Sequence, residues 1–180
     1  ILLYRQGIID QTDQKPLNQA YEDLQTGYTD AENDKQHICD AIIELRKFIE
    51  DDEILKFVKR KAQLYTLFSV VFYMQRENIA VEQCQKDRLE YFVKLYSVFN
   101  NDMDLSGEIS DSEKILFDWL KKYKLASSEG LNKHTNRMIR YNVMKDFLFG
   151  LTDELEEAQS TLYEKMQATS TDNAEEDLKD

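Results

Sequence analysis

The sequence predicts an all-α protein, a single bundle of about seven or eight helices. Two observations support this fold class: the 180 residues include only one proline and five glycines, and apolar residues recur with a period near 3.6, whereas no segment alternates like a strand. The composition, 42% hydrophobic and 32% charged, is that of a soluble globular protein. A chain of this length fits one domain that buries roughly 70% of its unfolded surface.

The first elements follow from start and stop signals. A helix ends near Ile9, and after a polar turn Pro16 occupies the first position of a helix that stops at Gly27. Thr29 and Glu32 have the spacing of a capping box, so the next helix begins there. We expect the two helices to bury Leu17, Ala20, Tyr21 and Leu24 in the first, and Ile38, Ile42, Leu45, Phe48 and Ile49 in the second.

The middle of the chain holds the predicted centre of the bundle. Asp51 and Asp52 give a negatively charged first turn to a helix from about Glu53 to Arg76, whose second half is apolar on all sides and should contact several partners. A helix from about Val81 to Asn100 follows. Ser110 then caps a helix that presents Ile115, Leu116, Trp119, Leu120 and Tyr123.

The last third of the chain contains two further predicted helices. The segment LASSEG, residues 125–130, is a predicted loop. A helix from about Asn132 to Gly150 follows, and Thr152 caps a last helix that ends near Met166. The inward-facing residues of the first of these two helices should be Met138, Ile139, Val143, Phe147 and Leu148.

We expect residues 1–167 to form one helical domain and the acidic residues 168–180 to form a disordered tail. The longest apolar run, Leu64 to Met74, reaches about half of the 20 residues that a bilayer span requires, so no membrane partner is expected. Cys39 and Cys84 are isolated and fit two reduced thiols in a cytoplasmic protein. The opening ILLYRQG lacks an initiator Met, a basic n-region and a cleavage site, so no signal peptide is expected. Its amphipathic pattern and abrupt start predict a fragment of a longer protein.

A basic island, Lys114 to Lys145, lies within a strongly acidic chain. It holds eight Lys and Arg against two carboxylates, a net charge of +6 that leaves −18 for the rest of a protein whose total is −12. Arg137 and Arg140 are i, i+3 on one helix face, and with Lys133 and Lys145 they could clamp nucleic-acid phosphates. Alternatively these cations pair with the acidic remainder or with an acidic surface of a missing domain, and paired arginines can also bridge helices.

A second candidate site is a calcium loop between two predicted helices. Its spacing matches an EF-hand, with Gly107 at the sharp turn and oxygen ligands at Asp102, Asp104, Ser106, Glu108, Ser110 and Glu113. The polar residues Asn100 and Asn101 stand where such a hand places apolar residues, and no second hand is visible. The alternative is a polar loop in which Ser110 and Glu113 form a capping box.

Catalysis finds little support in the residue pattern. We expect His37 and His134 to be surface or partly buried polar residues and not general bases, and the chain contains no phosphate-binding glycine loop or zinc spacing. We therefore expect no catalytic residue and no cofactor other than the calcium alternative. The net charge of −12 leaves a further alternative open, an acidic helical adaptor that mimics DNA.

Three stretches together resemble one known family. Residues 1–24 combine Leu2, Leu3, Gly7, Asp10, Leu17 and Tyr21; residues 59–74 are a basic and then aromatic segment with Lys61, Leu67 and Phe68; residues 129–148 contain Gly130, Asn132, Arg137 and Arg140. The set is similar to the helical C-terminal part of a bacterial family built on a ParB-like domain, which includes GmrSD-type modification-dependent restriction enzymes and related anti-phage proteins.

The resemblance covers about three quarters of the chain but not the ParB-like domain itself. That domain would carry an Ile-Pro-x-Phe-Gln-Arg stretch and the nuclease or nucleotide chemistry, so no catalytic residue can be transferred to this sequence. The resemblance implies a non-catalytic helical accessory or scaffold domain of a DNA-directed restriction or anti-phage defence protein in the bacterial cytoplasm. Its implied partners are the missing N-terminal ParB-like domain and possible DNA contacts.

Overall fold

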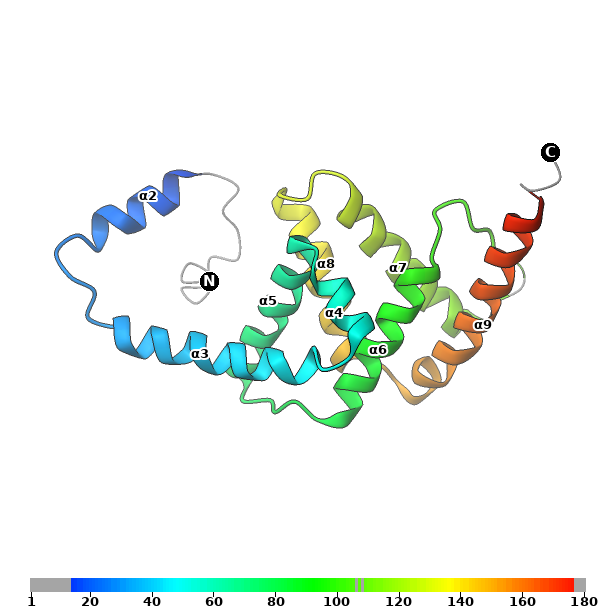
Figure 1. The fold of residues 1–180 in the computed structure, drawn as a ribbon, viewed down its shortest axis with the longest axis horizontal. Helices are drawn as coiled ribbons and strands as arrows, with labels where there is room; N and C mark the ends of the chain where they lie inside the picture. The colour runs from blue at the N-terminus through cyan, green and yellow to red at the C-terminus, as the bar shows by residue number, and fades with distance from the viewer. Residues whose placement is uncertain (1–13, 106, 108, 177–180) are drawn as a thin grey trace.

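The computed structural model describes residues 14–105, 107 and 109–176, and within them the chain is all-α, as predicted. No strand occurs in this described part. The first predicted helix, which ends near Ile9, lies outside it. The eight helices of this described part are α2 (Gln14–Asp23), α3 (Ala31–Phe48), α4 (Asp52–Val58), α5 (Lys61–Glu77), α6 (Gln83–Val98), α7 (Asp111–Ser128), α8 (His134–Phe149) and α9 (Asp153–Glu176) (Figure 1).

The core forms where α4, α5, α6, α7 and α8 meet. Phe92 of α6 is at its centre, with ring centroids 6.0 Å from Phe57, 4.9 Å from Tyr123 and 5.1 Å from Phe147, all edge-on. Such edge-to-face pairs add to the stabilisation that apolar burial provides. α5 packs against α3, α4 and α8, which agrees with the prediction that this apolar segment contacts several partners.

The N-terminal helices differ from the prediction. α2 stands apart from the other helices (Figure 1), and Leu17 and Tyr21, which were predicted to be buried, are 38% and 69% exposed. Ile42 of α3 is also exposed. An apolar stripe shows that a helix has a face for a partner, but no other described helix packs extensively against α2.

The predicted capping box at Thr29 and Glu32 is wrong. α3 begins one residue later than expected, with Asp30 at its N-cap and no side-chain cap hydrogen bond. The nearby hydroxyl of Tyr28 instead donates to the carboxylate of Asp34, which is buried in the first turn of α3.

The predicted helix from Glu53 to Arg76 is two helices with a corner between them. Asp51 caps α4 by accepting hydrogen bonds from the backbone amides of Glu53 at 2.8 Å and Ile54 at 3.1 Å. α4 ends at Val58, and Arg60, with φ −78° and ψ 121°, starts α5 in a new direction. No glycine or proline marks this corner in the sequence, so tertiary packing produces it. The corner exposes three consecutive cations, Lys59, Arg60 and Lys61.

Two predicted caps are confirmed in the C-terminal half. Ser110 and Glu113 form the capping box of α7, in which the Glu113 amide donates to Ser110 Oγ at 3.3 Å and the Ser110 amide donates to Glu113 Oε2 at 2.6 Å. Thr152 Oγ1 accepts from the Leu155 amide at 3.4 Å at the start of α9. The predicted loop 125–130 is shorter than expected, because α7 continues to Ser128.

α9 extends beyond the predicted end near Met166, and runs to Glu176. Residues 177–180 of the predicted tail lie outside the described part of the chain. Among the helices that the structure describes, none is long and apolar enough to cross a membrane.

Candidate functional site

A basic cavity of about 320 Å³ opens between the start of α5 and the loop that leads into α8. This volume is at the lower end of the range for small-molecule sites. The lining contains three cations and no carboxylate, histidine or thiol, together with an aromatic ring and two apolar side chains: Lys61, Ala62, Tyr65, Leu131, Asn132, Arg137 and Arg140. We call it the α5–α8 cavity.

Arg140 forms the inner wall of the α5–α8 cavity and is 1% exposed. Its guanidinium donates from Nη1 to the Ala126 carbonyl at 2.5 Å, from Nη2 to the Leu131 carbonyl at 3.0 Å, and from Nε to Thr66 Oγ1 at 3.3 Å. All three acceptors are neutral, and no described carboxylate pairs with it. Burial lowers the pKa of Arg140, and the nearby charge of Arg137 acts in the same direction. An arginine nevertheless stays protonated in proteins, so a buried positive charge remains here without a counterion from the described chain.

Arg137 lies closer to the mouth of the cavity. Its Nε and Nη2 donate to the Asn132 carbonyl at 3.2 and 2.8 Å, and its guanidinium carbon lies 5.5 Å from the centre of the Tyr65 ring. A guanidinium over an aromatic face is attracted by the ring quadrupole, so Tyr65 helps to hold Arg137 beside Arg140.

The loop between α7 and α8 directs backbone carbonyl oxygens toward Arg137 and Arg140. Asn136 Nδ2 donates to the carbonyls of Glu129 at 2.7 Å and Gly130 at 3.2 Å, and the Lys133 amide donates to the Gly130 carbonyl at 2.8 Å. Gly130 has φ +52°, a left-handed conformation that favours glycine. These bonds fold the loop back, so that the carbonyls of Leu131 and Asn132 reach the arginines.

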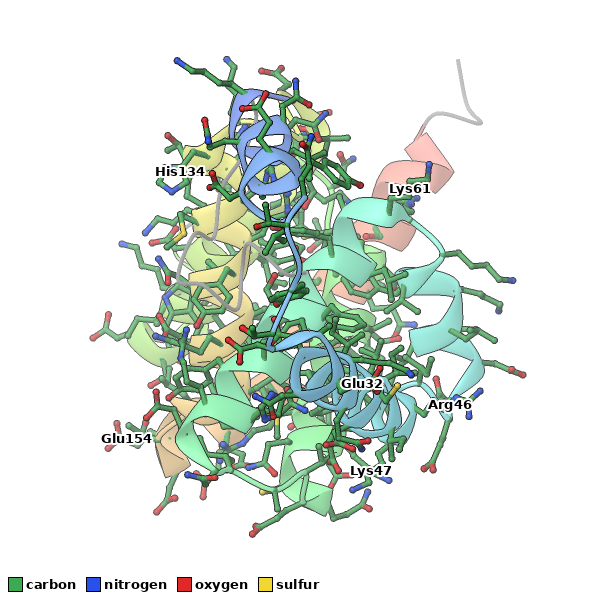
Figure 2. The ribbon with its side chains drawn as sticks, turned by 90° about the vertical axis from the view of Figure 1, so that its left-hand side faces the viewer. Glu32, Arg46, Lys47, Lys61, His134 and Glu154 are labelled. Atoms are coloured by element: carbon green, nitrogen blue, oxygen red, sulfur yellow. The ribbon has the colours of Figure 1, made fainter. Side chains whose placement is uncertain are left out.

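Two helices begin beside this cavity, and each has a cation at its N-cap. Arg60 is the N-cap of α5 and Lys133 is the N-cap of α8, and neither makes a side-chain cap hydrogen bond. In Figure 2 the first residues of these helices, Lys61 and His134, both lie in the upper half of the view, on opposite sides of it. Helix N-termini carry a partial positive charge and normally take Ser, Thr, Asp or Asn as the cap. The helix ends therefore add to the positive potential that the side chains create.

A buried polar network lies behind the cavity wall. Gln63 Nε2 donates to the Tyr96 hydroxyl at 3.3 Å, and the Tyr123 hydroxyl donates to Gln63 Oε1. Burial raises the pKa of Tyr123, so the phenol is neutral and acts as a donor. Fully partnered buried polar groups rigidify their surroundings, and this network fixes the first turn of α5 against α6 and α7.

The structure brings together two of the four cations predicted to contact nucleic acid. Arg137 and Arg140 line the cavity, whereas Lys133 is exposed at the α8 N-cap and is not part of the lining. Lys145 lies about 12 Å along the axis of α8 from Arg137, by the rise per residue. Its Nζ is 3.6 Å from a carboxylate oxygen of Asp146, which neutralises it.

The cation and the aromatic ring that α5 contributes to the cavity were not predicted as site residues. Lys61 and Tyr65 come from α5, far from the basic island in the sequence. The run Lys59, Arg60, Lys61 before a largely apolar helix was the available signal, because it concentrates positive charge at the start of that helix.

The calcium loop has a different arrangement from an EF-hand where it is described. Glu113, the last of the predicted ligands, is 3% exposed and accepts from Lys165 Nζ at 2.9 Å as well as from the Ser110 amide. It would have to release both contacts to bind calcium. Asp102 and Asp104 are exposed, whereas Ser106 and Glu108 lie outside the described residues. In that described part, no group of three or more His, Cys, Asp or Glu is arranged to hold a metal.

Comparisons of the chain with protein-family models, with curated proteins and with solved structures find no match. The resemblance to the ParB-like family therefore stays a hypothesis based on the sequence, and the geometry of the α5–α8 cavity is the basis for a functional assignment.

Proposed function

We propose that this chain is a non-catalytic helical domain that binds a nucleic-acid phosphate in the α5–α8 cavity. The observation that carries the proposal is the buried guanidinium of Arg140, which has only neutral acceptors and shares its cavity with Lys61 and Arg137. This role agrees with the accessory domain of a DNA-directed protein that the sequence resemblance implies.

Electrostatics favour an anion in this cavity. Moving a charged group out of water carries a penalty of about several kcal/mol. A buried counterion offsets this penalty by its attraction to the charge. Elsewhere in the protein, carboxylates supply that counterion, as Glu156 does for Arg88 at 2.9 Å and Glu113 does for Lys165 at 2.9 Å. Lys61 and Arg140 form no such pair with any described residue. This contrast favours an external anion over the alternative that the cations pair with the acidic remainder.

The chemistry of the lining favours a phosphate group. A guanidinium presents donors in a planar fork that matches phosphate oxygens, and lysine adds a point charge. Half to two thirds of protein–DNA hydrogen bonds go to the phosphate and sugar. Tyr65, Ala62 and Leu131 provide an apolar wall against which a sugar can rest.

Fluorescence anisotropy with a labelled oligothymidylate of about 12 nucleotides tests the proposal. Lys61→Gln and Arg137→Gln should each weaken binding by about tenfold, because each removes a charge-assisted hydrogen bond. Arg46→Gln is the matched control, since it removes the same charge from the exposed end of α3, away from Lys61 (Figure 2). Arg140 is not substituted in this test, because it also joins three parts of the fold.

Two results would contradict the proposal. The first is no detectable binding of single-stranded or duplex DNA at about 0.1 M salt, where the Debye length is about 10 Å. The second is an equal loss of affinity in all three variants, which would mean that binding follows total charge and not the cavity.

The place of the chain in a larger protein has its own test. We expect the source gene to encode, upstream of Ile1, a domain with an Ile-Pro-x-Phe-Gln-Arg stretch. A different upstream domain would remove the ParB-like assignment and leave the phosphate-binding proposal to the anisotropy measurements.

A further inference from the structure

A second basic cavity, of about 260 Å³, lies on the other side of the corner between α4 and α5. Its walls come from α4, α6 and α7, and we call it the α4–α6 cavity. It is lined by Glu53, Lys56, Phe57, Arg60, Val93, Tyr96, Ser97 and Lys124. Arg60 lines this cavity and the next residue, Lys61, lines the α5–α8 cavity. Consecutive Cα atoms are about 3.8 Å apart, so both cavities begin at one peptide unit.

The α4–α6 cavity also contains cations without a carboxylate partner. Lys124 is half-buried, its Nζ donates to the Tyr96 carbonyl at 3.3 Å, and it lies 4.3 Å from the centre of the Tyr96 ring. Arg60 forms no ion pair with any residue that the structure describes. Lys56 is the exception, because Glu53 neutralises it at 2.5 Å. The net positive charge of this cavity therefore comes from Arg60 and Lys124.

The two cavities share a rigid wall. Tyr96 accepts from Lys124 through its carbonyl in one cavity and from Gln63 through its hydroxyl. Gln63 is 1% exposed and directly follows Ala62, which lines the other cavity. The distance between the cavities is thus set by buried hydrogen bonds and not by exposed side chains.

We propose that the α4–α6 cavity is a second phosphate-binding site. One nucleic-acid strand then crosses the Arg60–Lys61 corner with neighbouring phosphates in the two cavities. This inference rests on the proposed function and assigns its substrate class as a single strand. A strand is flexible enough to place successive phosphates in two recesses, whereas a duplex presents its phosphates on a stiff outer surface.

The dependence of affinity on salt concentration gives the number of phosphates that the protein neutralises. For single strands, the slope of log K against log salt is about −0.7 for each phosphate neutralised. Two occupied phosphate-binding sites therefore predict a slope of about −1.4, and one predicts about −0.7. The measurement uses a labelled oligothymidylate of about 12 nucleotides with the full chain, at or above about 0.1 M salt.

Arg60→Gln and Lys124→Met are the test variants. We expect each to weaken binding by about tenfold and to reduce the steepness of the slope from about −1.4 to about −0.7. Arg60 is exposed, so its variant keeps the test valid if Lys124→Met disturbs the packing on Tyr96. Arg46→Gln should leave both affinity and slope unchanged.

The outcomes separate this inference from the function on which it rests. The second phosphate-binding site would be overturned by a wild-type slope near −0.7 that neither variant changes. If Lys61→Gln still weakened binding in that case, the first site, in the α5–α8 cavity, would remain. No binding by the wild type would overturn both. Competition by inorganic triphosphate as strong as that of the oligonucleotide would also overturn the assignment, because the ligand would then be a short polyphosphate and not a strand.

Discussion

Replacing Arg140 by methionine tests how a buried charge can stabilise this fold without a counterion. The change orphans three acceptors, each worth about 1–3 kcal/mol when left unsatisfied in the interior. The Ala126 carbonyl is deeply buried, since its residue is 2% exposed, and should account for most of the loss. Water can reach the Leu131 carbonyl, because Leu131 is 41% exposed. Thr66 Oγ1 keeps its own hydrogen bond to the Ala62 carbonyl at 2.8 Å.

The net effect is smaller than the sum of the lost hydrogen bonds. Methionine also removes the penalty for burying a cation, which offsets part of the loss. We expect the free energy of unfolding to fall by about 2 kcal/mol. In a chain of this size the melting temperature should then drop by about 4–8 °C.

Urea denaturation followed by circular dichroism measures this difference. Arg140→Lys should be at least as destabilised as Arg140→Met, because the ammonium keeps the charge but cannot reach the three acceptors with a planar fork. Arg137→Met is the control near the surface and should change the stability by less than about 0.5 kcal/mol. A methionine variant as stable as the wild type would refute the reasoning, since the hydrogen bonds of Arg140 would then not exceed its desolvation penalty.

Three further predictions concern the cap, the loop and α2. Burial opposes ionisation of Glu113, but hydrogen bonds from Lys165 and the Ser110 amide outweigh it and hold its pKa at about 2, below the ordinary value of 4.5. The Glu113→Gln variant should therefore lose about 2 kcal/mol near neutral pH, and its difference from the wild type should vanish as pH falls from 4.5 toward 2 in acid denaturation series. Gly130→Ala strains φ +52° and should lose about 1 kcal/mol together with oligothymidylate affinity, in urea and anisotropy titrations. Tyr21→Ser should change the free energy of unfolding, measured by thermal denaturation, by less than about 0.5 kcal/mol, whereas the same substitution of a core tyrosine would lower it several-fold more.

The parts of the fold that depend on local hydrogen bonds could be predicted from the sequence. Ser110 and Thr152 cap α7 and α9 as expected, because a cap needs only a hydroxyl and amides two or three residues away. The corner at Arg60 could not be predicted, since it results from the packing of Phe57 against Phe92 and Tyr96 and not from a local breaker. Hydrophobic periodicity was similarly insufficient for α2, because it identifies an apolar face and not the surface that covers it.

Of the seven residues that line the α5–α8 cavity, two could be predicted as site residues from local spacing. Arg137 and Arg140 share a helix face by their spacing alone. Their partners from α5 come together with them only in the folded bundle, where Arg140 bonds Thr66, 74 residues earlier in the chain. The clue that sequence reasoning overlooked is the run Lys59, Arg60 and Lys61, which places a cation at the N-cap of α5. Local rules that a protein breaks without compensation often mark functional positions.

The net negative charge of the whole chain should make strand binding strongest at intermediate salt. The whole chain has a net charge of −12, which repels a polyanion at long range, whereas the cations of the cavities act at contact. At about 0.01 M salt the Debye length is about 30 Å, so the repulsion reaches across the molecule, and at about 0.1 M it shrinks to about 10 Å. Affinity measured by anisotropy should therefore rise from 0.01 M to about 0.1 M salt and then fall with the slope expected for released counterions. A continuous rise in affinity down to the lowest salt would contradict this argument, because it would mean that the phosphates meet only the positive part of the surface.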